Sequence, residues 1–459
     1  MSILAGSLSS CIGYKEATKE NIDQLKEKSE IASHIQIPDD WIFDRKAGSK
    51  SISYDWINDL KTPQLEALVK EGMLYNADLI IAREKLNQIE LAMETAGSDL
   101  YPSVSAVANT SNNLVSGSQV QRLALKANWE IDLWGKNKSS QMASTSSYFS
   151  AKHQNTLLHQ SIAGMISKAY YLNIAGNIQE DKIESYIQKT KDLEKLYIIQ
   201  KKIGTANAID VSNISAEIIS LQGYLEKIKN ANMQSRRSLE LLTGKYPEGK
   251  LATQNFFNSV KSSIPESFPL ELLENRSDIQ ASHFQIEKAF YEVQEAKAAR
   301  LPSLSISSSL GSAGSNVESI NSLFSNPLVK VGGGLVSPLF NGGKLKKNVE
   351  VKNSQQKQVV EEYSKAVLNA LNEVESSLAN LRSIERQMAY TTNAVNELKN
   401  NISLTEKQIK VGTSNSFVLI RKQRDLLKNE MNLINLELQY RIERINLYMA
   451  LGAENFIYS

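Results

Sequence analysis

Apolar side chains recur every three or four residues along two segments of the chain, which is the spacing of a coiled-coil seam. In the first segment the steps are 4, 3, 4 and 3 residues, through Ile214, Ile218, Leu221, Leu225 and Ile228. The second segment keeps this register, interrupted by Arg441, through Leu427, Met431, Ile434, Leu438, Ile445 and Tyr448. A helix with so narrow a seam must pack against partners along its length, so both segments are predicted to be structural rods.

Helix-breaking residues are absent from unusually long stretches. Neither glycine nor proline occurs between Gly343 and Gly412, or between Gly412 and Gly452. About 68 residues of continuous helix extend about 100 Å at about 1.5 Å per residue, which is far longer than a globular core requires. The sequence therefore predicts a mainly α-helical protein.

Two other segments alternate between apolar and polar residues and are predicted to be β-hairpins, over residues 102–134 and 302–340. The apolar positions of the first are Leu123, Leu125, Ala127, Trp129, Ile131 and Leu133. Those of the second are Leu304, Ile306, Leu310, Val329, Val331, Leu335 and Leu339. Such runs of about ten residues are typical of membrane β-barrel strands, apolar outside and polar toward the lumen. Either hairpin taken alone favours a different interpretation, in which one face covers a soluble core.

The two halves of the chain repeat the same motifs in the same order. Residues 76–103 align with residues 276–303 without a gap. The paired positions include Pro102 with Pro302, Gly204-Thr205 with Gly412-Thr413, and Gly244 with Gly452. Because several anchors recur in one order, the chain is predicted to be a tandem duplication.

Four strands cannot close a β-barrel within one chain. If the strands span a membrane, an open sheet edge leaves backbone groups unpaired in hydrocarbon, at a cost of several kcal/mol for each group. Several chains must then share one barrel. Three chains would supply twelve strands and, from the long helices, a second barrel of packed coiled coils. The sequence therefore predicts a hollow tube.

Composition narrows the possible functions. The 459 residues carry a formal net charge of +2, which gives no electrostatic case for nucleic-acid binding. One cysteine and four histidines exclude a disulfide framework and a zinc ribbon. The pair His153 and His159 has the wrong spacing for metal ligands on one helical face, and Gly342-Gly343-Lys344 lacks the other residues of a phosphate loop. No run approaches about 18 apolar residues, so no transmembrane helix is predicted. The sequence predicts neither an enzyme nor a metal or cofactor site.

Cys11 follows a short run of apolar and small residues that ends in Leu8-Ser9-Ser10. This resembles the tail of a bacterial lipoprotein signal, with residues 1–10 as its remnant and Cys11 as the acylated residue. A signal peptide needs a basic n-region and a longer apolar core, so we interpret the start of the sequence as truncated or misassigned. The alternative is an ordinary buried cysteine. We expect a covalent lipid on Cys11 and, because Ile12 follows it, sorting to the outer membrane.

Eight short motifs, each weak alone, are specific in their order and spacing. They are Tyr54-Asp55-Trp56, Asn76-Ala77-Asp78-Leu79, Leu100-Tyr101-Pro102, Trp129-Glu130-Ile131-Asp132-Leu133-Trp134-Gly135-Lys136, Arg276-Ser277-Asp278-Ile279, Ala299-Arg300-Leu301-Pro302, Ser337-Pro338-Leu339-Phe340-Asn341-Gly342-Gly343 and Leu447-Tyr448-Met449-Ala450-Leu451-Gly452. Over about residues 54–452 the sequence thus resembles the TolC-like outer-membrane factors, and among them the OprM-type lipoproteins of multidrug efflux. The resemblance implies a trimer with a shared 12-stranded outer-membrane β-barrel that continues into a long periplasmic α-barrel.

The same resemblance implies the domain organisation and the partners. Residues 11–63 and 245–275 are expected to form an equatorial belt beside two structural repeats at residues 64–244 and 276–452, with residues 453–459 as a C-terminal tail. The expected partners are a periplasmic membrane-fusion adaptor, an inner-membrane pump of the RND type and outer-membrane lipid.

In TolC-like proteins the two Gly-Thr turns form the periplasmic tip, where the tube narrows and the adaptor docks. The corresponding residues here are Gly204, Thr205, Gly412 and Thr413. Asp210 matches the Asp-Val that follows the first tip, whereas Val418 and Arg421 replace two aspartates of TolC-like relatives. These three residues are the candidate gate. Threefold symmetry would turn Arg421 into a ring of three positive charges in place of an acidic ring. This predicts a weaker cation preference at the entrance than in relatives with an acidic ring. Alternatively, Arg421 points sideways and pairs with a neighbouring helix.

Two classes of function remain. The chain is either a passive export duct in the bacterial outer membrane with a long periplasmic extension, or a soluble structural coiled-coil protein. The alternating hairpins and the lipidation box favour the duct. Within that class, drug efflux and type I protein secretion are both open, and the lipid anchor favours efflux.

Overall fold

The computed structural model describes residues 14–34, 62–113, 118–258, 275–314 and 328–452. Cys11, the signal remnant and the C-terminal tail therefore lie outside the described residues. The chain forms two compact units. The first, which we call the strand unit, is drawn from residues 1–36, 83–154 and 278–367. The second, the tip unit, is drawn from residues 37–82, 155–277 and 368–459.

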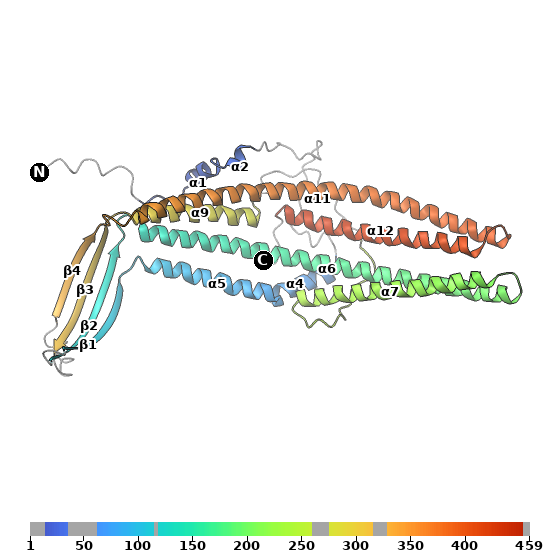
Figure 1. Cartoon of the computed structure of the whole chain (residues 1–459), viewed down its shortest axis with the longest axis horizontal. Helices are drawn as coiled ribbons and strands as arrows, with labels where there is room; N and C mark the ends of the chain where they lie inside the picture. The colour runs from blue at the N-terminus through green and yellow to red at the C-terminus, as the bar shows by residue number, and fades with distance from the viewer. Residues whose placement is uncertain (1–13, 35–61, 114–117, 259–274, 315–327, 453–459) are drawn as a thin grey trace. The chain divides into compact units, whose positions relative to one another are not determined.

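Long helices dominate the described residues, and each main helix of the first half has a counterpart of the same length in the second half (Figure 1). The paired helices are α5 (Ala77–Ser98) and α9 (Ser277–Ala298) with 22 residues each, α6 (Lys136–Lys202) and α11 (Lys344–Lys410) with 67 each, and α7 (Ala208–Leu242) and α12 (Ser416–Ala450) with 35 each. The remaining helices are α1 (Lys19–Lys26), α2 (Glu30–Ser33) and α4 (Pro63–Tyr75). The equal lengths confirm the predicted duplication.

The tip unit repeats the same contact at equivalent places in the two halves. The Asn76 side chain donates from Nδ2 to the carbonyl of Leu242, the last residue of α7, at 2.9 Å. At the aligned position, Arg276 donates from Nη1 to the carbonyl of Ala450, the last residue of α12, at 2.6 Å. Both donors satisfy a helix-terminal carbonyl that has no partner within its own helix. The halves therefore share geometry at a site where their side chains differ.

The predicted coiled-coil seam is buried in the tip unit. Apolar side chains from α6, α7 and α12 form its core, and this core includes Ile214, Ile218, Leu221, Leu225, Leu427, Met431, Ile434, Leu438, Ile445 and Tyr448. Arg441, which interrupts the pattern, is buried as well. Its guanidinium lies 4.1 Å from the ring centroid of Phe257 and donates to the carbonyls of Glu437 and Asn258, each at 2.8 Å. Arg441 is thus accommodated in the seam because Phe257 and Asn258, in the segment that follows α7, and Glu437 of α12 supply its partners.

The buried carboxylate of Glu240 holds the start of the segment that follows α7, which the structure describes as far as residue 258. Glu240 on α7 accepts hydrogen bonds from the backbone N–H groups of Gly249, Lys250 and Leu251 at 2.6–2.9 Å. Burial alone would raise the pKa of Glu240, but the three N–H donors hold its pKa below its ordinary value. The ionised carboxylate therefore ties this segment to the end of α7.

In the strand unit, the four strands form one antiparallel sheet in the order β1-β2-β3-β4. The strands are β1 (Ser103–Asn113), β2 (Ser118–Ile131), β3 (Ser303–Gly314) and β4 (Leu328–Val336). Each predicted hairpin is present, and the pairing of β2 with β3 joins the two hairpins into one sheet. The strands end earlier than the alternation suggested, since Leu133 and Leu339 lie beyond β2 and β4.

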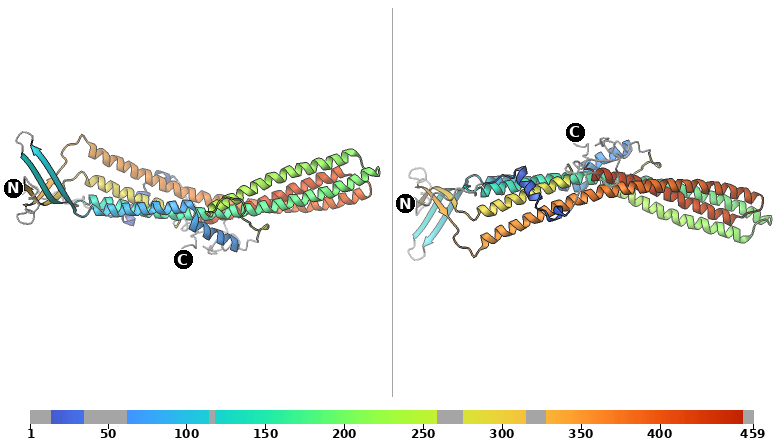
Figure 2. Two further views of the ribbon diagram at one scale, coloured as in Figure 1. Left: turned by 90° about the horizontal axis from the view of Figure 1, so that it is seen from below. Right: turned by 90° about the horizontal axis from the view of Figure 1, so that it is seen from above.

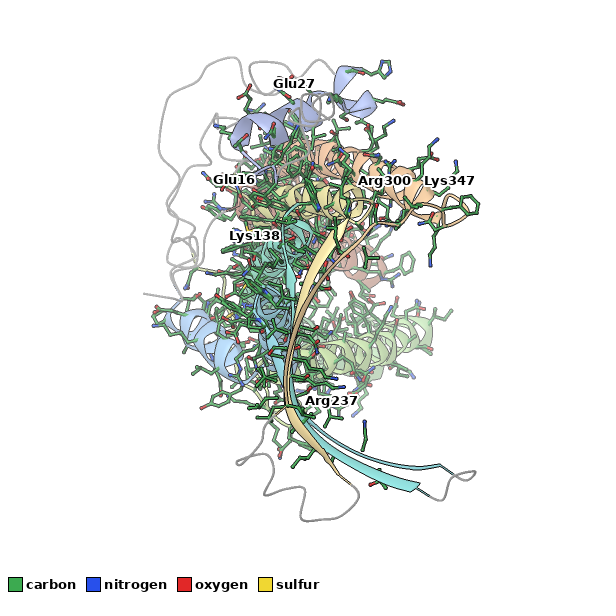
Figure 3. All side chains as sticks on the ribbon, turned by 90° about the vertical axis from the view of Figure 1, so that its left-hand side faces the viewer. Glu16, Glu27, Lys138, Arg237, Arg300 and Lys347 are labelled. Carbon is green, nitrogen blue, oxygen red and sulfur yellow. The ribbon has the colours of Figure 1, made fainter. Side chains whose placement is uncertain are left out.

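The N-terminal helices pack on the strand unit. Glu361 of α11 accepts from the backbone N–H groups of Glu30 and Ile31 at 2.7 and 3.1 Å, which fixes the start of α2. The ring of Tyr14 stacks with that of Tyr291 at a centroid distance of 6.4 Å. Glu27, at the end of α1, is exposed (Figure 3).

We predict that the Asn76→Ala substitution lowers the free energy of unfolding by about 1–3 kcal/mol. The substitution leaves the Leu242 carbonyl without its partner and removes the Asn76 Oδ1 that accepts from the N–H groups of Asp78 and Leu79. Urea unfolding followed by circular dichroism measures the change. Asn230→Ala, at an exposed position of α7, is the matched control and should stay within about 0.5 kcal/mol of the wild type. Equal stability of the two variants would contradict the capping role.

Candidate functional site: two tip turns and an apolar sheet face

The turn between α6 and α7 is a Schellman motif, which ends a helix with a left-handed residue. Gly204 has φ of 79° and donates to the Lys201 carbonyl at 3.1 Å. Thr205 donates twice to the Gln200 carbonyl, from its backbone N–H at 2.9 Å and from Oγ1 at 3.1 Å. Glycine suits this place because it adopts positive φ without a steric clash.

The turn between α11 and α12 has the same geometry. Gly412 also has φ of 79° and donates to the Ile409 carbonyl at 3.0 Å. Thr413 donates from its backbone N–H and from Oγ1 to the Gln408 carbonyl, at 2.9 and 3.2 Å. The four residues predicted at the tips thus form two matching turns, and the two helical hairpins of the tip unit run side by side toward them (Figure 2).

The candidate gate residue Asp210 has a structural role within one chain. Asn207 Oδ1 accepts from the Asp210 backbone N–H at 2.8 Å, and Asp210 Oδ2 accepts from the Asn207 N–H at 3.3 Å, which is a capping box at the start of α7. Ser416 Oγ also lies 3.5 Å from Asp210 Oδ1. In the second hairpin Asn415 caps α12 by accepting from the Val418 N–H at 3.1 Å. Asp210 therefore helps to order both tip turns.

Apolar side chains are exposed around both turns. Ile203 and Ile209 are each 69% exposed beside the first turn, and Val411 and Phe417 are 72% and 56% exposed beside the second. Apolar residues grouped on an exposed surface and held by well-ordered turns commonly mark a contact with another protein. We call these four residues the apolar tip.

A groove of about 1350 Å³ runs between α7 and α12 behind the apolar tip. Its lining includes the cations Arg421, Arg424 and Lys428 and the carboxylates Glu217 and Asp425. Arg421 is exposed, and over the described residues of a single chain the structure shows no ion pair for it. The alternative for Arg421 was a sideways ion pair with a neighbouring helix. Within the described part of one chain, this ion pair is not formed.

Sequence analysis missed the ion pair that joins the two hairpins behind the tip. Arg424 donates to Glu217 with Nε at 3.2 Å and Nη2 at 2.5 Å, in a two-pronged arrangement. Glu217 is only 8% exposed, and its neighbour Tyr186 is half-buried. Burial raises the pKa of the Tyr186 phenol, and the carboxylates of Glu217 and Glu430 raise it further. One signal in the sequence could have indicated this ion pair: a carboxylate at position 217, next to the seam residue Ile218.

The residues predicted for the barrel strands share one face of the sheet. The register pairs Leu125 with Leu310, Trp129 with Ile306 and Ile131 with Leu304, and β4 continues the same face through Val329, Val331 and Leu335. Leu125, Trp129, Ile306, Val331 and Leu335 are exposed in a single chain. A continuous apolar face that no part of the described strand unit covers is the counterpart of a lipid-facing surface.

Aromatic side chains mark the end of this face. The indole N–H of Trp129 donates to the Leu100 carbonyl at 3.0 Å, and that of Trp134 donates to the Pro302 carbonyl at 2.7 Å. Three basic residues lie where the strands meet the helices, namely Lys138, Arg300 and Lys347 (Figure 3). Tryptophan beside basic residues is the composition of a membrane–water interface. Among the described helices, none is both long and apolar enough to cross a bilayer.

Comparison with known proteins agrees with this geometry. Residues 269–453 match the family model described as "Outer membrane efflux protein". The pyoverdine export outer membrane protein OpmQ of Pseudomonas aeruginosa is 23% identical over 443 residues, which is 92% of each chain. The chain is therefore similar to outer membrane efflux proteins over nearly its whole length. The matched family model and the relatives are outer membrane efflux and export proteins, which supports an outer-membrane exit duct rather than an enzyme.

Solved structures share the fold of this chain. The structure of CusC has a TM-score of 0.82 and 22% identity, and covers 91% of this chain and 96% of that chain. The Campylobacter jejuni CmeC channel has a TM-score of 0.84 and 18% identity, and covers 93% and 95%. The long helical hairpins and the four-stranded sheet are therefore those of this channel fold.

We predict that Gly204→Ala speeds hydrogen exchange in the tip turn about fivefold. No atom lies within 4 Å of a Cβ at this position, so the change acts only through the positive φ and amounts to about 1 kcal/mol. Exchange mass spectrometry of residues 199–207 measures the effect.

Gly223→Ala is the matched control for the tip turn. It adds the same methyl group in equally open space, but in the interior of α7 and without positive φ. It should slow exchange around residue 223, because alanine favours a helix by about 0.5–1 kcal/mol over glycine. Equal effects of both substitutions would show that backbone conformation does not maintain the tip.

Proposed function

We propose that three copies of this chain form one duct that conducts small molecules across the outer membrane, delivered by a periplasmic adaptor and an inner-membrane pump of the RND type. The observation that carries this proposal is the open sheet, because over the described residues its outer strands β1 and β4 each pair on one side only. Beside an apolar face, those edges need partners from other chains. Pairing β4 of one copy with β1 of the next closes the sheet when three copies contribute four strands each.

The lipid-facing side follows from the exposed apolar face described above. In a trimer this face would form the outside of the shared 12-stranded barrel, and the tryptophans Trp129 and Trp134 would lie at its periplasmic rim. The long helices would form the α-barrel below it, since each seam needs packing partners along its whole length. Residues 11–63 and 245–275 are proposed to surround this α-barrel as an equatorial belt.

The apolar tip is the proposed docking surface for the adaptor. Its four side chains lie beside matching Schellman turns, so the two hairpins present similar surfaces. In a trimer the six turns would form a ring of quasi-equivalent sites. Gly204, Thr205, Gly412 and Thr413 shape the turns, while Asp210, Val418 and Arg421 lie just inside them as the proposed gate.

The names of the relatives favour efflux of small solutes over secretion of proteins. Relatives at 23–24% identity include the toluene efflux pump outer membrane protein TtgC of Pseudomonas putida and the cation efflux system protein CusC of Escherichia coli. Another relative is the probable outer membrane lipoprotein SilC of Salmonella typhimurium, which supports a lipid anchor on Cys11. We propose the same class of cargo and the same kind of anchor for this chain.

Single-particle imaging of the protein extracted from outer membranes tests this proposal. We expect a hollow cylinder of threefold symmetry with one detergent belt around the strand end, because the apolar face of the sheet is exposed in a single chain and would face lipid in the trimer. A monomeric or dimeric solid rod without a belt would overturn the duct.

We predict that the Arg421→Ala channel prefers cations more strongly than the wild type. Three Arg421 guanidinium groups near the threefold axis repel cations, and their removal lifts this barrier. The reversal potential across a planar bilayer in a KCl gradient measures the preference. Arg83→Ala, which removes an exposed arginine from α5, is the control. Strong cation selectivity that is the same in the wild type and in Arg421→Ala would contradict the gate assignment.

A further inference from the structure

The face of the sheet opposite the apolar face carries two lysines in one row. The register pairs Ser105 with Lys126, Lys126 with Ser309, and Ser309 with Lys330, so these four residues cross the sheet from β1 to β4 on the same side. Lys126 and Lys330 are both exposed. Neighbouring strands lie about 4.8 Å apart, which places the two lysine Cα atoms about 10 Å apart.

Little negative charge offsets these lysines. Over strand residues 103–110, 123–131, 303–311 and 328–336, whose side chains the structure describes, Glu130 supplies the one carboxylate. Its Oε1 lies 2.5 Å from Nζ of Lys136, at the helix end of the sheet. The distance between the lysines is close to the Debye length of about 8–10 Å at physiological salt, so their fields overlap.

Small residues surround the lysine row. Ser307 and Ser309 of β3 lie on the lysine face, and Ser307 pairs with Gly332 of β4. A Cβ built on Gly332 would find its nearest atom, Ser307 Oγ, only at 3.8 Å. Hydroxyl groups can donate hydrogen bonds to an anion, and the short side chains leave the ammonium groups accessible to solutes.

We propose that Lys126 and Lys330 form an anion-binding band inside the sheet-lined part of the duct, which favours solutes that bear carboxylate or phosphate groups. This inference rests on the proposed trimer, in which the polar face lines the lumen and three copies bring six lysines together. A narrow lumen with low-dielectric walls focuses the field of such a band. The band is distinct from Arg421, which belongs to the tip unit.

Block of single-channel current by inositol hexakisphosphate tests the band. The polyanion is added to one side of a planar bilayer at a time, with the voltage drawing it into the pore. We expect block from the side of the sheet, and an increase of about tenfold or more in the half-blocking concentration in the double variant Lys126→Gln/Lys330→Gln. Lys28→Gln, in the exposed turn after α1, removes a like charge and should leave the block unchanged.

The outcomes separate this inference from the function proposed above. Channels that conduct but show equal block in the wild type and the double variant would overturn the anion-binding band and leave the duct intact. Block that acts only from the tip side and disappears in Arg421→Gln would also overturn the band. Failure of the wild type to form threefold channels would remove the duct itself.

Discussion

The structure depends on one constraint, which is that the backbone at a sheet edge must find hydrogen-bond partners when it lies in an apolar environment. The sheet of this chain has an apolar face that runs across all four strands in register, from Ala106 through Leu125 and Leu310 to Val329. Within the part of the chain that the structure describes, its two outer strands also have edges without a neighbouring strand. A soluble sheet could leave such edges to water. A sheet whose apolar face meets lipid cannot, so the strand count of a single chain and the chemistry of its surface together require assembly.

Because of the duplication, one chain supplies two similar copies of each main helix and of the β-hairpin. The paired helices have identical lengths in the two halves. The chemistry of the halves has diverged where geometry permits it. A neutral amide at Asn76 and a guanidinium at Arg276 satisfy equivalent carbonyls, and only the second also pairs with a carboxylate, Glu373, at 2.8 Å. Quasi-equivalent rather than identical hairpins follow from this divergence.

Periodicity in the sequence predicted most of the fold, because the seam and the alternating strands are both set by local spacing. The tip glycines were also predictable, since positive φ favours glycine. The joining of the hairpins through β2 and β3 was not, because alternation says which face a residue occupies but not which strand lies beside it. The Glu217–Arg424 pair was missed for a related reason. Its two residues lie more than 200 positions apart in the sequence. A carboxylate beside an apolar seam has no evident role until its partner on another helix is known.

A duct that supplies no energy can select its cargo only by width and by the groups that line it. In the proposed trimer, Arg421 of the tip unit and Lys126 with Lys330 of the strand unit would be cations that face the conduit. These cations belong to a chain whose net charge is only +2. In that trimer a pump could force a cation past such fields, whereas an anion that enters past Arg421 would meet a second attractive site at Lys126 and Lys330, and this arrangement would favour outward passage of anionic solutes.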